Sequence, residues 1–504
     1  MGKYFRYATF SHRWEDNEPL FEKVIKVVVY DLEPSPTHEK LQMFCKIVRE
    51  AGFNWAWSDT CCINKGDHFV LQEALVSMFK WYERSAMTLI FLRGVDRLAK
   101  RGALTRSIWN MRAWTLQEYH ASKVVRIYTE DWTPYLGLDT YNHKESPEVI
   151  SEMEEATGIS AQDLMALRPG SDDIREKLRL ASTRLTTRVE DAAYSLLGIF
   201  SASLSITYGE GDKALGRLLA QLLTSSGDVS ILAWTGRSGT FNSCLPASIT
   251  VFSQPPSSYI PLAVTDAEMG TTIAGLRSLN LTVATNLYDR LNELSIPLFI
   301  GRRMKLPCLT FKLGRVSISN GSEGVFRAQT YGLGIVEIET HEDISQLSSL
   351  YLIHPWLNFL LDREPVGSVT RAIPIDNDQS SVLGELPSFP DLSNTTSRAP
   401  QTRAAWFATR PEPPFGGQAT TSAADAASLL PPSTLSPSEK QTRVLQFIAR
   451  LRRPFGALLL TPTCRNVNEY RRVAAESLIT VQVEDLTPAI LDKLVQGVRM
   501  LDVL

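Results

Sequence analysis

Short β-branched and aromatic runs alternate with helical patterns along residues 4–130, and this alternation constrains the fold more than any other feature of the sequence. The expected strands cover residues 7–11, 53–58, 87–92 and 124–128. Helices are expected between them, where apolar residues recur every three or four positions, at about residues 38–51, 71–82 and 107–121. Such an alternation predicts βαβ units and a parallel sheet that is covered by helices on both faces.

The rest of the chain divides into further segments by composition and periodicity. Residues 145–227 are expected to be helical, and residues 228–378 are expected to be rich in strands. Residues 379–441 are rich in Ser, Thr, Pro and Ala without periodicity, which predicts a flexible linker. Residues 442–504 are expected to form a small α/β segment. The predicted fold is therefore an α/β domain at residues 1–135, followed by a helical region and a β-rich α+β C-terminal part.

The charge balance argues against a nucleic-acid partner, because many nucleic-acid binders are basic overall. The chain has 52 Lys and Arg residues and 55 Asp and Glu residues, which gives a net charge of −3. No stretch approaches the ~20 apolar residues of a membrane span, and the N-terminus has no apolar signal core. We therefore expect a cytoplasmic protein without a membrane span.

Several familiar patterns of catalysis and metal binding are missing from the sequence. The six cysteines form no C-x-x-C pair and the histidines show no metal-ligand spacing, so no metal site is expected. Ser11 and His12 have no nucleophile elbow around them, which disfavours a serine hydrolase. Arg217 and Leu218 stand where a P-loop requires Lys and Ser or Thr, so no nucleotide-driven motor is expected.

Three short motifs lie in the N-terminal segment. The first, Ser11-His-Arg-Trp14, follows the first expected strand, where Ser11 and Arg13 are expected in a loop. The second is Trp57-Ser-Asp-Thr-Cys-Cys-Ile-Asn64, which places Asp59 at the end of the second strand. The third motif, before the fourth strand, is Arg112-Ala-Trp-Thr-Leu-Gln-Glu118. Ligands of parallel sheets usually bind beyond the carboxyl ends of the strands, so the first two motifs lie where a ligand is expected.

In this order and spacing the motifs resemble the fungal heterokaryon-incompatibility (HET) domain, which carries Ser-x-x-Trp, Trp-x-Asp-x-x-Cys-Ile-Asn and Arg-x-Trp-Thr-Leu-Gln-Glu elements. Residues 187–200 and 204–215 are similar to a segment that commonly follows the HET core in fungal members. One departure is Glu15, where many members have Gly, and we expect it to stiffen or narrow the first loop. The resemblance implies an intracellular role in programmed cell death after non-self recognition, a form of fungal innate immunity, with protein partners and self-association.

The HET fold is similar to the TIR domain, a flavodoxin-like parallel-sheet module, and some TIR domains cleave NAD with a glutamate in a Trp-Cys-x-x-Glu context. Trp114-Thr-Leu-Gln-Glu118 looks like that element, so the resemblance implies a TIR-like domain with Glu118 as the catalytic candidate. A carboxylate beside the ribose would stabilise the oxocarbenium-like state of this reaction. NAD is then a substrate, and no cofactor is expected. The candidates for binding it are Ser11, Arg13, Trp14, Asp59, Arg112 and Trp114.

Glu118, Asp59 and Arg112 also have a structural interpretation, as do two tryptophans of the second strand. Glu118 pairs with Arg112 or caps a turn in that interpretation. Asp59 accepts hydrogen bonds from the backbone that follows it, which is the interpretation we favour, and Arg112 forms an ion pair with Glu118 or Asp59 instead of contacting phosphate. Trp55 and Trp57 alternate along a strand and therefore share one face, which predicts that both pack in the core.

Two hypotheses about function follow. In the first, the chain is an NAD glycohydrolase, which requires Glu118 to face an open cleft with residues 11–14 opposite. In the second, it is a non-catalytic HET-domain protein that signals by self-association, which a Glu118 buried against Arg112 without a cleft would favour.

Overall fold

The computed structural model describes residues 5–157, 159–254, 270–271, 281–319, 324–347, 349–356, 437–463, 468–483 and 486–504. The chain divides into two compact units, of which the first comprises Met1–Arg363 and Gln441–Leu504 and contains both sheets. Most of the expected linker lies outside the described residues, and its last residues begin the helix α14 (Pro437–Leu451). In the part of the chain that is described, no helix is both long and apolar enough to span a membrane.

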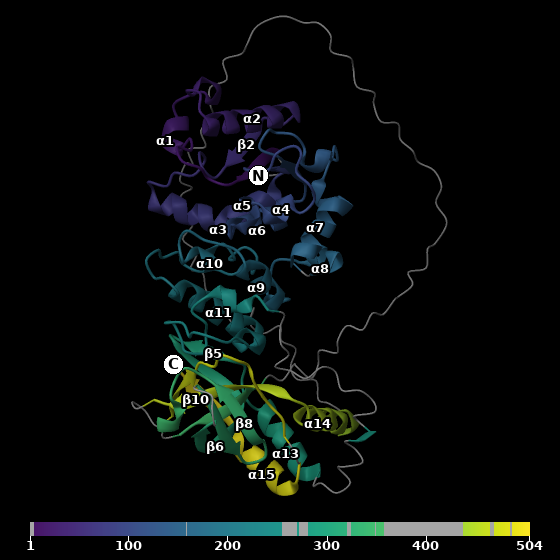
Figure 1. Cartoon of the computed structure of the whole chain (residues 1–504), viewed down its shortest axis with the longest axis vertical. Helices are drawn as coiled ribbons and strands as arrows, with labels where there is room; N and C mark the ends of the chain where they lie inside the picture. The colour runs from purple at the N-terminus through teal and green to yellow at the C-terminus, as the bar shows by residue number, and fades with distance from the viewer. Residues whose placement is uncertain are drawn as a thin grey trace, which may run out of the picture. The chain divides into compact units, whose positions relative to one another are not determined.

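The first sheet is parallel, as the alternation of strands and helices predicts. It belongs to the purple and blue part of the chain at the top of Figure 1. Its strands are β1 (Tyr7–His12), β2 (Trp55–Ser58), β3 (Met87–Phe91) and β4 (Val125–Tyr128), in the order β2-β1-β3-β4. This is the order of the first four strands in one common class of doubly wound sheet, in which ligands bind beside the first strand at its carboxyl end.

Helices pack on both faces of this sheet. The side chains of β1 point alternately to one face and to the other, so they contact helices on both. Ala8 and Phe10 pack in one core cluster with Phe44 of α2 (Pro36–Glu50). On the opposite face, Ser11 contacts α6 (Trp114–Ala121), and the hydroxyl group of Tyr82 in α3 (His68–Arg84) donates to the carbonyl oxygen of Phe10. The polar side of β1 therefore lies against the helices that carry the third motif.

In the first domain the helices α2 and α3 each begin at a residue whose side chain caps the helix. The Ser35 hydroxyl group accepts from the backbone N–H of His38, and Pro36 occupies the first helical position of α2. The Asp67 carboxylate accepts from the backbone N–H groups of Phe69 and Val70 at the start of α3.

The tryptophan-rich helix expected at residues 107–121 is two helices, α5 (Ile108–Met111) and α6. Between them Arg112 is extended, with φ −80° and ψ 137°. The N–H group of Ala113 donates to the carbonyl oxygen of Leu185 at 3.0 Å, and Arg112 and Leu185 form an isolated parallel bridge. The prediction of one continuous helix is therefore wrong, because a distant segment pairs with the backbone at its middle.

The segment after the first sheet is helical, as predicted. Its described α-helices are α7 (Pro147–Thr157), α8 (Ala161–Ala166), α9 (Ile174–Ser182), α10 (Asp191–Tyr194) and α11 (Lys213–Ser226). The short helices α1 (Phe21–Val24) and α4 (Ala103–Arg106) belong to the first domain. The amphipathic helix expected at residues 189–200 is shorter than its pattern suggests, since only α10 is α-helical and turns follow it.

The C-terminal part is β-rich, as predicted, and forms one nine-stranded sheet. Its strands are β5 (Leu298–Ile300), β6 (Arg303–Ile318), β7 (Val325–Thr330), β8 (Gly334–Glu339), β9 (Tyr351–Pro355), β10 (Phe455–Pro462), β11 (Glu469–Val473), β12 (Ile479–Val481) and β13 (Val498–Val503). The helices α13 (Leu281–Asn292) and α15 (Pro488–Gly497) belong to the same core cluster as strand residues of this sheet. The strands of residues 228–378 and 442–504, expected as separate segments, pair within this sheet, where β13 lies beside β6 and β10 beside β9.

Candidate functional site

A cavity of about 650 Å³ lies at the carboxyl ends of β1 and β2. Its wall includes five of the six residues expected to bind a ligand, namely Arg13, Trp14, Asp59, Arg112 and Trp114. The fold thus brings together residues from all three motifs, which lie up to a hundred positions apart in the sequence. This place in a parallel sheet is the one where ligands usually bind.

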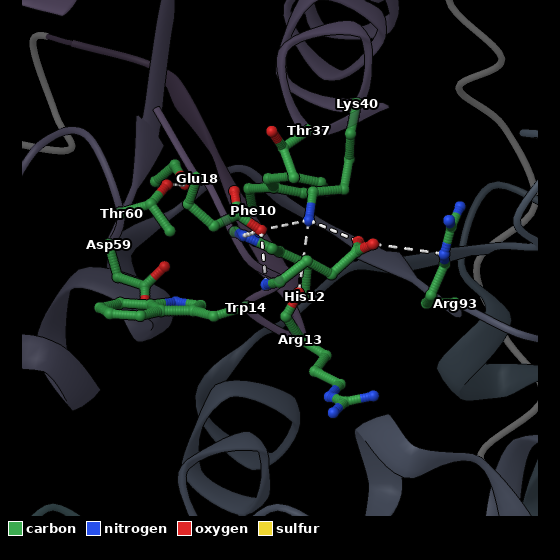
Figure 2. Close-up of polar contacts among 12 residues, drawn as sticks. Phe10, His12, Arg13, Trp14, Glu18, Thr37, Lys40, Asp59, Thr60 and Arg93 are labelled. Atoms are coloured by element: carbon green, nitrogen blue, oxygen red, sulfur yellow. Dashed lines mark hydrogen bonds and ion pairs between the residues drawn. The ribbon is translucent and has the colours of Figure 1, made fainter. Parts of the chain in front are cut away.

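Trp14 and Asp59 form one wall of the cavity (Figure 2). The indole Nε1 of Trp14 donates to Oδ2 of Asp59 at 2.8 Å. The Nζ atom of Lys65 lies 3.1 Å from the centroid of the Trp14 ring, which is a close cation–π contact. Among the described residues the Asp59 carboxylate accepts no hydrogen bond from the backbone that follows it, so the interpretation favoured from the sequence is wrong on this point.

A buried ion-pair network holds the loop that carries Arg13 and Trp14 (Figure 2). The Lys40 ammonium group on α2 contacts the Glu18 carboxylate, lies 2.9 Å from Oε1 of Glu15 and donates to the carbonyl oxygen of Arg13 at 3.4 Å. Lys40 is 4% exposed and Glu18 is 7% exposed, so each charge depends on the other for its partner.

Glu15 extends this network to a second strand end, because its Oε2 lies 3.3 Å from Nε of Arg93, shortly after β3. Burial alone would raise the pKa of Glu18, but hydrogen bonding and the charges of His12 and Lys40 outweigh it and lower that pKa to about 2. The loop is therefore tied to α2 and to the residues after β3.

Glu118 lies beside this cavity but does not line it. It is 4% exposed, and its carboxylate accepts a short hydrogen bond from the Ser11 hydroxyl group. Ser11 Oγ in turn accepts from Nε1 of Trp109 at 2.8 Å. Burial, helped by the nearby charge of Asp59, raises the pKa of Glu118 to about 7, although the Ser11 hydrogen bond and the charge of Arg112 act in the opposite direction.

Ser11 is the one binding candidate that is absent from the cavity wall. The sequence places it in the first loop, whereas β1 continues to His12 and pairs Ser11 with Ile90 of β3. Ser11 is fully buried, so its hydroxyl group serves Glu118 and Trp109.

Two other expectations from the sequence are corrected. Arg112 forms no ion pair with Glu118 or Asp59 in the described part of the chain; its guanidinium group donates to the carbonyl oxygen of His12 at 2.7 Å. Trp55 is 38% exposed and lies edge-on to Phe5, because β2 is the edge strand of the first sheet. Trp57, on the same strand, packs against Trp81 with the ring centroids 5.0 Å apart.

The opposite wall comes from the helical region. Asp191 accepts a hydrogen bond from the Tyr208 hydroxyl group at 3.0 Å, and both residues line the cavity together with Trp114. The Glu190 carboxylate accepts from the backbone N–H groups of Gly209 at 2.8 Å and Gly211 at 3.0 Å. These two hydrogen bonds hold the turn that follows Tyr208, a residue of the cavity wall.

Sequence reasoning missed four of the charged or aromatic residues of the wall: Lys65, Arg188, Asp191 and Tyr208. The similarity of residues 187–200 and 204–215 to a segment of fungal HET proteins was the available signal for three of them, but only the fold brings them to the cavity wall. Lys65 lies just after the second motif and carried no signal of its own.

Cations outnumber carboxylates around this cavity. The ionisable residues on its wall are the cations Arg13, Lys65, Arg112 and Arg188 and the carboxylates Asp59 and Asp191. Trp14, Trp114 and Tyr208 add aromatic surface. An anionic ligand that carries an aromatic ring is therefore complementary to this wall.

The N-terminal region matches the model of one known protein family. Residues 7–107, which contain the first two motifs, match the family described as heterokaryon incompatibility protein (HET). The presence of a HET domain, as the motifs predicted, is thus confirmed for this region.

A particular relative also matches. The vegetative incompatibility protein HET-E-1 of Podospora anserina is 31% identical to the chain over 248 residues. This match covers 46% of the chain but only 17% of the relative, so the chain matches only a small part of that protein's length. No solved structure matches the chain significantly.

Proposed function

We propose that this chain acts in heterokaryon incompatibility, as a cell-death effector whose TIR-like N-terminal domain binds NAD in the cavity beside β1. The observation that carries the proposal is the composition of the cavity wall. The Trp14 and Trp114 rings offer flat apolar surfaces to an adenine or nicotinamide ring, and the Arg13 and Arg112 guanidinium groups suit diphosphate oxygens. The volume of about 650 Å³ falls within the range of roughly 300–1,000 Å³ that is usual for small-molecule sites.

The proposed reaction is hydrolysis of the nicotinamide–ribose bond. Water forms a bond to the anomeric carbon and releases a proton to solvent, while the C–N electron pair leaves with nicotinamide as a neutral molecule. In this proposal the ionised Glu118 carboxylate stabilises the positive charge that develops on the ribose.

The reaction needs Glu118 to reach the ribose. Trp114 and Glu118 are four residues apart on α6, so they share one helix face, and Trp114 already lines the cavity. Glu118 itself is 4% exposed and hydrogen-bonded to Ser11. The proposal therefore includes a movement that opens Glu118 to the cavity when NAD binds or the chain assembles.

NAD turnover by the full chain tests this proposal, with nicotinamide release measured by chromatography at pH 8. We expect turnover by the wild type once it is assembled, and a loss of about 100-fold or more in Glu118→Gln, because its side chain cannot ionise. The matched control is Glu73→Gln on α3, where Glu73 is exposed, and it should retain full activity. Wild-type turnover in Glu118→Gln would remove Glu118 from the mechanism, and NAD binding without any turnover would reject hydrolysis.

A second function, non-catalytic signalling by self-association, is favoured by one observation, the burial of Glu118 away from the cavity wall. Cells that express the chain distinguish the two functions when NAD content and survival are measured together. Death caused equally by the wild type and Glu118→Gln, with NAD unchanged in both, would establish the second function. Death and NAD loss that both disappear in Glu118→Gln would establish the first.

A further inference from the structure

Lys65 lines the same cavity, and the proposed function gives its side chain no role. It lies on the turn after β2, six residues beyond Asp59, and its Nζ atom rests on the Trp14 ring, 3.1 Å from the centroid. That nitrogen is buried and has no hydrogen-bond partner among the described residues. An ammonium group has three N–H donors and no acceptor, and leaving such donors without acceptors costs free energy.

The neighbouring polar groups have other partners. The Asp59 carboxylate accepts from the Trp14 indole, and Arg112 donates to the carbonyl oxygen of His12. Arg188 lies over the Tyr208 ring, 4.3 Å from the centroid. Arg13 and Arg188 also have no hydrogen-bond acceptor among the described residues, but of the four cations on the cavity wall only Lys65 has a buried nitrogen atom without a hydrogen-bond partner.

We infer that Lys65 is the residue that selects a phosphorylated ligand in this cavity, by donating hydrogen bonds to the oxygens of its phosphate or diphosphate group. The inference rests on the proposed function, because it assigns a group of the proposed ligand to a residue of the same cavity. Phosphate oxygens supply several acceptors and negative charge at one place, which matches an ammonium group without an acceptor.

The contact with Trp14 makes Lys65 suitable for this role. The indole face holds the ammonium group in place, and the hydrogen bond from Nε1 to Asp59 fixes the plane of the indole. A donor that is positioned before the ligand arrives loses little conformational freedom on binding. Burial lowers the pKa of Lys65, and a bound phosphate would oppose that effect.

Titration calorimetry on the full chain with three probes tests the inference: NAD, inorganic pyrophosphate, and nicotinamide riboside, which lacks phosphate. The variant Lys65→Met keeps an apolar stem against Trp14 and removes the charge, whereas Lys65→Arg keeps the charge. Lys46→Met is the matched control, because the Lys46 side chain is 60% exposed on α2 and pairs with Glu50. Thermal unfolding of each variant confirms that it is folded.

We expect Lys65→Met to weaken NAD and pyrophosphate about 10- to 100-fold, the usual effect of losing a charged hydrogen bond, and to leave nicotinamide riboside unchanged. Lys65→Arg should recover part of the loss, and Lys46→Met should bind as the wild type does. Equal weakening of all three probes, or unchanged NAD binding in Lys65→Met, would overturn the inference and leave the proposed function standing. Binding of pyrophosphate but not of NAD, with the pyrophosphate lost in Lys65→Met, would reject NAD as the ligand and retain the role of Lys65. Absence of binding for all three probes in the wild type would reject both.

Discussion

At the scale of a single residue, Glu118 makes the stability of the protein depend on pH. Burial in the folded state raises its pKa from 4.5 to about 7, so the folded protein retains a proton that the unfolded chain releases between these values. Its contribution to stability is therefore fully present below pH 4.5 and is lost as the pH rises through 7. Glu118→Gln keeps an acceptor for the Ser11 hydroxyl group and cannot ionise.

We expect Glu118→Gln to be more stable than the wild type at pH 8, by on the order of 2 kcal/mol, and to lose this advantage at pH 5. Urea unfolding at the two pH values measures the free-energy difference. The control Glu73→Gln changes an exposed carboxylate and should differ little from the wild type at either pH. The explanation fails if Glu118→Gln has the same stability difference at pH 5 and pH 8.

Most of the binding residues predicted from the sequence lie on the cavity wall for a physical reason. Parallel strands end at one edge of a sheet, so residues just after β1 and β2, such as Trp14 and Asp59, meet there in any such fold. The first strand is one residue longer than predicted, and this difference places Ser11 inside the strand. Because β1 runs to His12, Ser11 lies inside the strand and faces α6, and its role as a loop residue was mispredicted.

The local sequence predicted most of the helices and strands, but it did not predict where a helix is interrupted. Residues 107–121 have no helix breaker, yet the chain leaves the helix at Arg112, where Leu185 pairs with the backbone on both sides of it. That break turns Arg112 toward His12 and begins α6 at Trp114. Helical periodicity cannot report a contact with a segment some seventy residues away, so this part of the site was not predictable from the motif alone.

A close approach between two elements gives a prediction at this scale. A Cβ atom at Gly198 would lie 2.2 Å from Cβ of Phe79 on α3, so only glycine fits where the turn after α10 meets that helix. Gly198→Ala should destabilise the protein by about 1–3 kcal/mol through overpacking. In Gly198→Ala/Phe79→Gly the Cβ atom of residue 79 and the clash are both absent, so the double variant should be more stable than the sum of the single effects predicts. Denaturant unfolding of the four proteins measures this coupling, and simple additivity would contradict the close approach.

The C-terminal sheet is the part of the whole molecule that the sequence described least completely. Alternating apolar residues indicated its strands, but strand order depends on pairing between distant segments. β13, the last strand in the described chain, pairs antiparallel with β6 along Val498–Val503 and parallel with β11. Composition separated residues 442–504 from the earlier strands because residues 379–441 interrupt the pattern, whereas the backbone hydrogen bonds join them in one sheet.

Arg472 connects this sheet to residues 232–234, shortly after the helical region. It lies on β11, is 5% exposed, and donates to the carbonyl oxygens of Leu232 at 2.9 Å and Trp234 at 2.7 Å. Its guanidinium carbon also lies 3.8 Å from the centroid of the Trp234 ring. The planar guanidinium group donates to two carbonyl oxygens and lies against one aromatic face at the same time. A lysine ammonium group cannot make these three contacts together.

Arg472→Met should therefore lower the free energy of unfolding by about 2–4 kcal/mol, because it leaves two buried carbonyl oxygens without these donors. Arg472→Lys should restore only part of that loss. Arg315→Met on β6, where Arg315 is exposed, is the matched control and should stay within about 0.5 kcal/mol of the wild type. Urea unfolding of the full chain measures all three variants. Full restoration by lysine would mean that the positive charge alone matters, and that the two-carbonyl contact does not stabilise the connection between the helical region and the sheet.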